Sequence, residues 1–198
     1  QGYESFCIDL RAHGKSQGNK IGFGYTEKRD VRALLDWIIR QPSYQDEDII
    51  LYGISMGGAT AINAAVDREE VKKVISVSSF YSYEDVFIHF MEQRGVPGAI
   101  RAMYRPAIRL VLRVKFGIRP VYHSPGKEIA RLNDQKVLIV HGDQDEQIPV
   151  HQARDLKEAA GEKAELWIVP GAEHMVLTDI LARDNEWYRK RVMDFIAQ

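Results

Sequence analysis

The sequence has a single cysteine, Cys7, so no disulfide bond can form within the chain. It also lacks an excess of charge, because 27 basic and 28 acidic residues leave a formal net charge of -1. Such a balance provides no long-range attraction to nucleic acid or to an anionic membrane, and we expect no nucleic-acid partner. Cys7 stands among apolar residues, where the sequence predicts a small buried residue of a strand.

Long hydrophobic runs are missing too. No apolar stretch approaches the length that spans a bilayer, and the first residues do not form a signal peptide. These absences favour a cytoplasmic protein, although the chain begins without methionine and inside a predicted strand. The 198 residues, 45% of them hydrophobic, suffice for one globular domain with a sizeable core.

The usual signatures of metal and nucleotide sites are absent as well. His89, His123 and His151 do not have the spacing of metal ligands, and the sequence contains no Cys-x-x-Cys or His-x-x-x-His pair. It contains neither a G-x-G-x-x-G motif nor a phosphate loop. The acidic cluster at residues 143–146 is explained more simply as a turn at the end of a strand than as a cation site. We therefore predict no metal and no cofactor.

What is present is a strand-to-helix turn built on glycine. The apolar residues 49–51 lead towards Gly53-x-Ser55-x-Gly57, and a run of small residues follows. This pattern is typical of a nucleophile elbow, in which a tight turn exposes the serine hydroxyl and a Cβ at either flanking glycine would collide with the neighbouring chain. A glycine-rich turn around an inert serine is the alternative.

An exposed serine needs a base to become a nucleophile, and the base needs a carboxylate partner. Residues 136–149 form a predicted buried strand that ends in an acidic turn with two candidates, Asp143 and Asp145. A further predicted strand, residues 164–169, precedes His174. The chain therefore holds Ser, Asp and His in the order that this geometry requires.

These residues resemble the α/β-hydrolase superfamily, in its microbial esterase and serine-aminopeptidase-like branch, over nearly the whole chain. The family pattern His-Gly-x-x-Asp-x-x-x-Pro is matched at His141, Gly142, Asp145 and Pro149. The resemblance thus implies that Asp145 is the acid of the triad. It also implies that the backbone amide of Met56, the residue after the nucleophile, is one of the two oxyanion-hole donors.

The resemblance implies a function as well as a fold. Alternating strands and helices support an α/β fold with a mostly parallel sheet and helices on both faces. The expected activity is that of a serine hydrolase that cleaves carboxylic esters or related small acyl compounds through an acyl-enzyme. Ser55 would attack, His174 would transfer the proton, and Asp145 would orient the imidazole. A peptidase or a thioesterase could use the same triad, and a non-catalytic binding protein or an inactive fragment of the fold is the alternative from another class.

The front of the chain resembles the fourth strand of this fold, at Tyr3–Asp9, followed by the family's Asp-x-Arg-x-x-Gly-x-Ser turn. His13 in that turn is interpreted as structural. The family's third strand should lie between this strand and residues 49–52, and the sequence has no segment for it, so N-terminal strands of the fold are expected to be missing. Unpaired central strands would favour oligomers. The second oxyanion donor would lie outside these residues, with poor ester hydrolysis as the result.

Residues 79–135 separate two predicted strands by more than the usual crossover. We interpret them as an inserted helical cap, with residues 1–78 and 136–198 as the hydrolase core. Caps of this kind determine which substrates reach the nucleophile. The aromatic residues predicted to line the substrate pocket are Phe87, Phe90 and Tyr104.

The predicted cap also carries a row of arginines four residues apart. We expect Pro106 to divide the row between two short helices, because proline fits best in a first helical turn. A solvated, salt-bridged face is favoured for these arginines over contact with an acidic substrate or a membrane surface. The row consists of Arg101, Arg105, Arg109 and Arg113.

Overall fold

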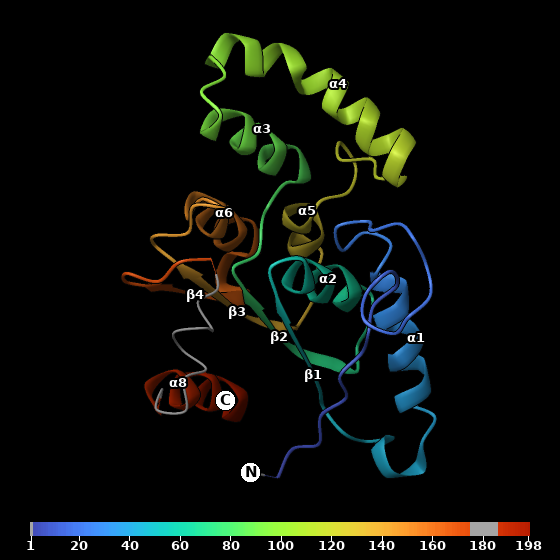
Figure 1. Ribbon diagram of the computed structural model, residues 1–198. Helices are drawn as coiled ribbons and strands as arrows, with labels where there is room; N and C mark the ends of the chain where they lie inside the picture. The colour runs from blue at the N-terminus through green and yellow to red at the C-terminus, as the bar shows by residue number, and fades with distance from the viewer. Residues whose placement is uncertain (1, 175–185) are drawn as a thin grey trace.

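The computed structural model describes residues 2–174 and 186–198, and within them it shows a four-stranded sheet (Figure 1). The strands follow the order β1-β2-β3-β4, and every neighbouring pair is parallel. The predicted α/β fold class is confirmed. The strands are β1 Ile49–Ile54, β2 Val71–Val77, β3 Lys136–Gly142 and β4 Ala164–Val169.

Helices cover both faces of this sheet, as Figure 1 shows. Alternate residues of β3 point to opposite faces: Val137 and Ile139 join the core under one layer of helices, while Leu138 and Val140 join the core under α8. This two-sided burial explains why the central strands read as continuous apolar runs. The first layer consists of α1 Lys28–Ile38, α2 Met56–Ala65, α5 Pro125–Ala130 and α6 His151–Ala160, and the other face is covered by α8 Glu186–Ala197.

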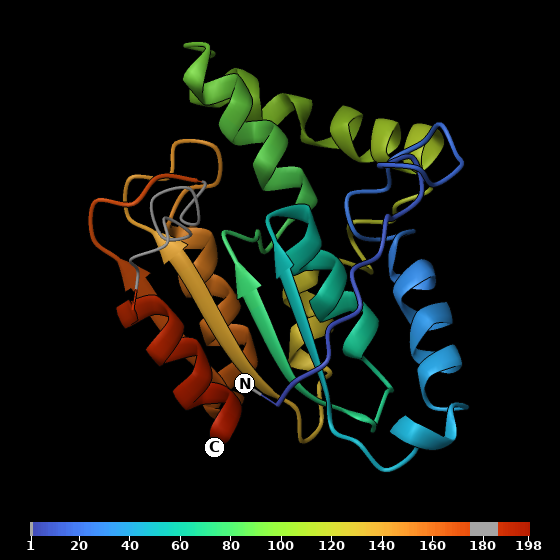
Figure 2. The ribbon, with the colours of Figure 1, turned by 60° about the horizontal axis from the view of Figure 1, so that its bottom comes forward.

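Two helices, α3 Tyr83–Gln93 and α4 Gly98–Phe116, stand beyond the carboxyl ends of the strands (Figure 2). The expected break at Pro106 is wrong, because α4 continues through the proline as one helix. Its two halves share a partner on α3, since Arg105 and Arg109 both donate to the Glu84 carboxylate. This common contact and apolar packing below the helix outweigh the backbone hydrogen bond that proline removes.

The last part of the segment predicted as a cap lies elsewhere. Ile129, in α5, and Leu132, two residues after the helix ends, belong to the same hydrophobic cluster as Val74 and Val137 of the sheet. Residues 124–132 therefore pack in the core layer, between α2 and α6, and not above the strands (Figure 1). The assignment of α3 and α4 to a cap stays a prediction.

The predicted strand at Tyr3–Asp9 is wrong. This segment has no regular secondary structure, and Cys7, predicted to be buried, is exposed. Within it, the Phe6 ring meets Trp37 and Tyr44 edge-on at centroid distances of 5.9 and 5.5 Å. A strand needs a neighbour for its backbone groups, and no described strand lies beside this one. The absence of further N-terminal strands stays a prediction.

Candidate active site

Ser55 lies in the turn between β1 and α2, in a backbone conformation that is rare for a residue with a side chain. Its φ is 52° and its ψ is -118°. The Ser55 amide donates to the Val77 carbonyl of the neighbouring strand at 2.7 Å, which anchors the turn to the sheet. A Cβ on Gly53 would lie 2.1 Å from the Gly57 carbonyl oxygen, so the chain can turn this tightly only with glycine there.

The expected crowding at Gly57 is wrong, because a Cβ added there meets no atom within 4 Å. The second crowded position is Gly58, where a Cβ would lie 2.7 Å from the Ser76 hydroxyl oxygen. Gly58 brings the start of α2 against the end of β2. The sequence signal for it was the run of small residues that begins directly after the motif.

The loops that follow β3 and β4 are joined by backbone contacts. The Asp143 amide donates to the Val169 carbonyl at 3.2 Å, and the Gln144 amide donates to the Ala172 carbonyl at 3.0 Å. The Asp143 carboxylate accepts from the Gly171 amide at 2.7 Å. Asp143 thus ties the acidic turn to the loop that carries the histidine.

The structure brings together Ser55, Asp145 and His174, the three residues predicted to form a triad. His174 Nδ1 lies 2.8 Å from Asp145 Oδ2, and His174 Nε2 lies 3.0 Å from Ser55 Oγ. With a charged carboxylate, Nδ1–H donates to Asp145 and Nε2 accepts from the Ser55 hydroxyl. Asp145, and not Asp143, faces the imidazole.

Asp145 is held in its charged form by several donors. Burial alone would raise its pKa, but hydrogen bonds from His141, His174 and the Ile148 amide outweigh burial and lower the pKa to about 2. The second carboxylate oxygen, Oδ1, accepts from the amides of Gln147 and Ile148 at 2.9 and 2.8 Å. The carboxylate is therefore ionised at neutral pH.

His141 is a member of this site that the sequence analysis treated only as part of a motif. Its side chain is fully buried, and its Nε2 lies 3.1 Å from Asp145 Oδ2 and 2.8 Å from the Ile148 carbonyl oxygen. Both neighbours are acceptors, so the proton resides on Nε2 and is shared between them. The four-residue spacing from His141 to Asp145 was the signal available in the sequence.

Met56 is the first residue of α2, with Ser55 as the N-cap. An amide at this position has no acceptor within its own helix, and it lies at the positive end of the helix dipole. The Met56 amide can therefore stabilise negative charge on an oxygen beside Ser55. A second donor stays unassigned.

The residues predicted to line a substrate pocket are spread over α3 and α4. Phe87 packs edge-on against Phe23 at a centroid distance of 5.8 Å, whereas the side chains of Phe90 and Tyr104 are exposed by 36% and 48%. Phe23 also meets Phe116 at 5.2 Å and has a φ of 51°, so a strained loop residue fills the space below α3 and α4. The role of these aromatics in binding substrate stays a prediction.

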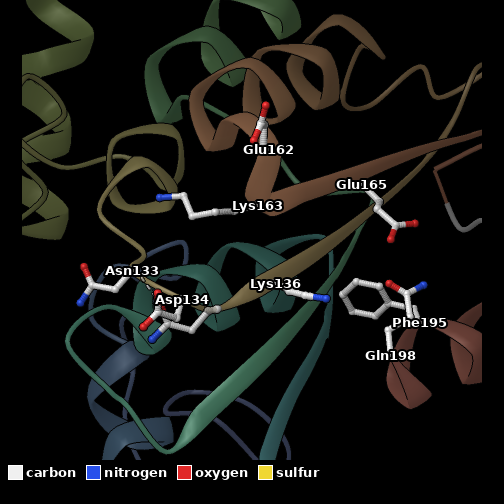
Figure 3. Close-up of a pocket in the computed structure, with 9 residues that line it drawn as sticks. Asn133, Asp134, Lys136, Glu162, Lys163, Glu165, Phe195 and Gln198 are labelled. Carbon is white, nitrogen blue, oxygen red and sulfur yellow. Dashed lines mark hydrogen bonds between the residues drawn. The ribbon is translucent and has the colours of Figure 1, made fainter.

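Two hollows of the surface lie apart from Ser55. One, of about 360 Å³, opens at the amino ends of β3 and β4, where Lys136, Glu165 and Phe195 line it (Figure 3). The other, of about 310 Å³, lies between residues 20–26 and the end of α4. Neither hollow is lined by a residue of the triad.

Within residues 2–174 and 186–198, no helix combines the length and apolar character needed to cross a membrane. In the same part of the chain, no three His, Cys, Asp or Glu side chains are arranged to hold a metal ion.

Comparison with known proteins finds relatives that match nearly the whole chain. The chain is 25% identical to the uncharacterized protein YfhR of Escherichia coli (strain K12) over 197 residues, which cover 98% of this chain and 60% of YfhR. It is 27% identical to the uncharacterized protein YqkD of Bacillus subtilis (strain 168) over 202 residues, which cover 98% of this chain and 62% of YqkD. The chain thus spans about three fifths of the length of these relatives.

Among solved structures, the Pyrococcus furiosus esterase Pf2001 superposes with a TM-score of 0.71 at 21% identity, covering 95% of this chain and 68% of that one. This likeness shows the α/β-hydrolase fold. The family model described as "Serine aminopeptidase, S33" matches residues 1–117, a range that contains the Ser55 turn but not Asp145 or His174. With more than half of its length matched, the chain belongs to the serine aminopeptidase S33 family of the α/β-hydrolase superfamily.

Proposed function

We propose that this protein is a serine hydrolase that cleaves carboxylic esters, or related acyl compounds, through an acyl-enzyme. The observation that carries the proposal is the continuous relay from Ser55 Oγ through the His174 imidazole to the Asp145 carboxylate, with distances of 3.0 and 2.8 Å. Nucleophile, base and orienting acid are the parts that acyl transfer requires. The strained turn at Ser55 keeps the hydroxyl in place for attack.

The reaction would proceed in two halves. Ser55 Oγ attacks the carbonyl carbon while His174 Nε2 takes its proton, and the Met56 amide stabilises the oxyanion. The intermediate collapses, the ester C–O bond breaks, and His174 gives the proton to the departing alcohol. Water then attacks the acyl-serine with His174 as base, which releases the carboxylic acid and restores Ser55.

Peptide hydrolysis is the second candidate, because the family model that matches the chain describes serine aminopeptidases. The same triad serves both reactions, since each begins with attack on an acyl carbon. Leaving groups distinguish them: an alkoxide from an ester leaves more readily than an amine from a peptide. A direct comparison should use acyl p-nitrophenyl esters and aminoacyl p-nitroanilides.

The proposal is tested with a fluorophosphonate probe, which reacts with activated serines. We expect one probe molecule on Ser55, located by mass spectrometry of the labelled peptide. Ser55→Ala should abolish labelling and ester turnover, and His174→Ala should lower kcat by roughly 10⁴ to 10⁶ because triad members act as a unit. A folded protein that takes up no probe would instead be a non-catalytic member of the fold.

A further inference from the structure

The outer face of α4 carries an apolar stripe that nothing in the described structure covers. Its members are three or four residues apart and therefore share one side of the helix. Met103, Leu110 and Val114 are exposed by 71%, 61% and 76%. An exposed apolar surface of this kind marks a site of contact with another molecule or a membrane. The α4 stripe consists of Ile100, Met103, Ala107, Leu110 and Val114.

The inner face of the same helix packs against the rest of the protein. Leu112 is buried, and Ile108 and Phe116 pack against the apolar cluster below α4. Because about 100° separates successive helical residues, these three lie opposite the α4 stripe. The stripe is therefore not needed to hold α4 on the protein.

The charges of α4 are all positive. The helix carries four arginines and one lysine and no acidic residue. Arg101 pairs with Glu92, and Arg105 and Arg109 pair with Glu84, so these three arginines are partly neutralised by α3. Arg113 and Lys115 are exposed, and within the described residues neither is paired with an acidic side chain. At the same angular spacing, they fall on opposite borders of the α4 stripe.

This combination selects one kind of occupant. An apolar stripe bordered by cations is typical of helices that lie in the plane of a membrane interface, with the apolar side chains at the acyl boundary and the cations at the headgroups. A second copy of the chain fits less well, because two such helices would bring like charges together. The position of α4 adds a further point: it forms the outermost layer at the end of the molecule where the strands end and Ser55 lies (Figures 1 and 2).

We propose that the α4 stripe docks the protein on an anionic lipid surface, with Arg113 and Lys115 against the phosphate groups. The net charge of -1 does not oppose this, because the attraction is local to one helix. Docking would turn the carboxyl ends of the strands towards the lipid. The consequence for substrate, esters drawn from that surface, rests on the proposed function, whereas the docking itself does not.

The test is sedimentation with vesicles of phosphatidylcholine alone and of phosphatidylcholine mixed with phosphatidylglycerol. We expect binding to the mixed vesicles, weakened by added salt. Leu110→Gln or Val114→Gln should lower the partition coefficient about ten-fold through lost apolar contact. Arg113→Gln should lower it about five-fold, since one cation near the surface contributes about that factor.

Matched controls lie outside α4. Arg154→Gln on α6 removes an exposed cation, and Tyr3→Gln removes an apolar side chain exposed by 58%, so both should bind vesicles like the unchanged protein. Ser55→Ala should also bind fully, which separates docking from catalysis. Circular dichroism checks that each variant is folded.

Three results would overturn the proposal. The first is no binding to the mixed vesicles by the unchanged protein. The second is equal binding by the stripe variants and the controls. The third is a dimer in lipid-free solution that Leu110→Gln converts to monomer, because the stripe would then join two copies of the chain.

Discussion

Gly53 and Gly57 flank Ser55 symmetrically in the sequence, yet their surroundings differ. Gly53→Ala would place a Cβ 2.1 Å from the Gly57 carbonyl oxygen, so we expect a less stable protein, by about 1 to 3 kcal/mol, and slow labelling of Ser55 by a fluorophosphonate. Gly57→Ala meets no atom within 4 Å and should fold and react with a small probe normally. The two variants are compared by their thermal unfolding and by the rate at which the probe labels Ser55. Equal stability and equal labelling rates would refute the proposed difference between the two glycines.

The two aspartates of the acidic turn offer a second matched pair. Asp145→Asn should lower kcat for esters by about 10⁴, because an amide favours the wrong tautomer of His174. Asp143→Asn removes only the acceptor of the Gly171 amide and should cost much less. Steady-state kinetics on one p-nitrophenyl ester compare them. A greater loss of kcat in the Asp143 variant would show that Asp143 is the acid of the triad.

The lowered pKa of Asp145 links the site to acid stability. Because its pKa is about 2 in the folded protein and 3.8 as a reference for the unfolded chain, the charged carboxylate stabilises the fold above about pH 4. That contribution, roughly 2 kcal/mol, is lost as the pH falls through 2. Asp145→Asn lacks it, so the difference in unfolding free energy between the two proteins should shrink from pH 4 to pH 2 in denaturant titrations. A constant difference would contradict the linkage.

The two helices above the sheet are joined by a buried carboxylate. Burial would raise the pKa of Glu84, but the guanidinium groups of Arg109 and Arg105 outweigh it and lower the pKa. Glu84→Gln keeps the shape of the side chain but loses both ion pairs, so the amides of α4 should exchange hydrogen faster. The free energy of opening α4 should fall by about 1 kcal/mol, a modest amount because the arginines are half exposed. Asp85→Asn, which affects only one pair, should change exchange less. Hydrogen exchange followed by mass spectrometry compares the variants.

The edge of the sheet at β1 leads us to predict that copies of the chain associate. Ile49 and Ser55 donate to the β2 side, so the backbone groups of the even-numbered residues, including Tyr52, face the other side. No described strand covers that edge, and an open edge of a parallel sheet favours association. We therefore expect the mass found by sedimentation equilibrium to rise with concentration.

Variants at one position test this expectation. Tyr52→Pro removes an edge donor and should reduce association, whereas Tyr52→Thr keeps the donor and should not. Both substitutions lose the contact between the Tyr52 and Tyr188 hydroxyls, 2.9 Å apart, so the comparison isolates the backbone. A strictly monomeric unchanged chain would show that the edge is not a site of association.

Much of the core was set by patterns that are local in the sequence. The apolar runs of β2 and β3 predict strands buried on both faces, and the glycine pattern around Ser55 predicts a tight strand-to-helix turn. The order Ser, Asp, His could also be read directly. The strands and the turn depend on residues a few positions apart, where propensity and steric fit act without the rest of the chain.

Other features were decided by contacts between distant residues. His174 and Ser55 are 119 positions apart, and the choice of Asp145 over Asp143 depends on how two loops meet at the ends of β3 and β4. Pro106 stays helical because Glu84 holds both sides of it, and Tyr3–Asp9 is not a strand because no neighbour completes its hydrogen bonds. A local pattern indicates what a segment can form. Whether the segment has a partner that stabilises this structure is decided only in the folded chain.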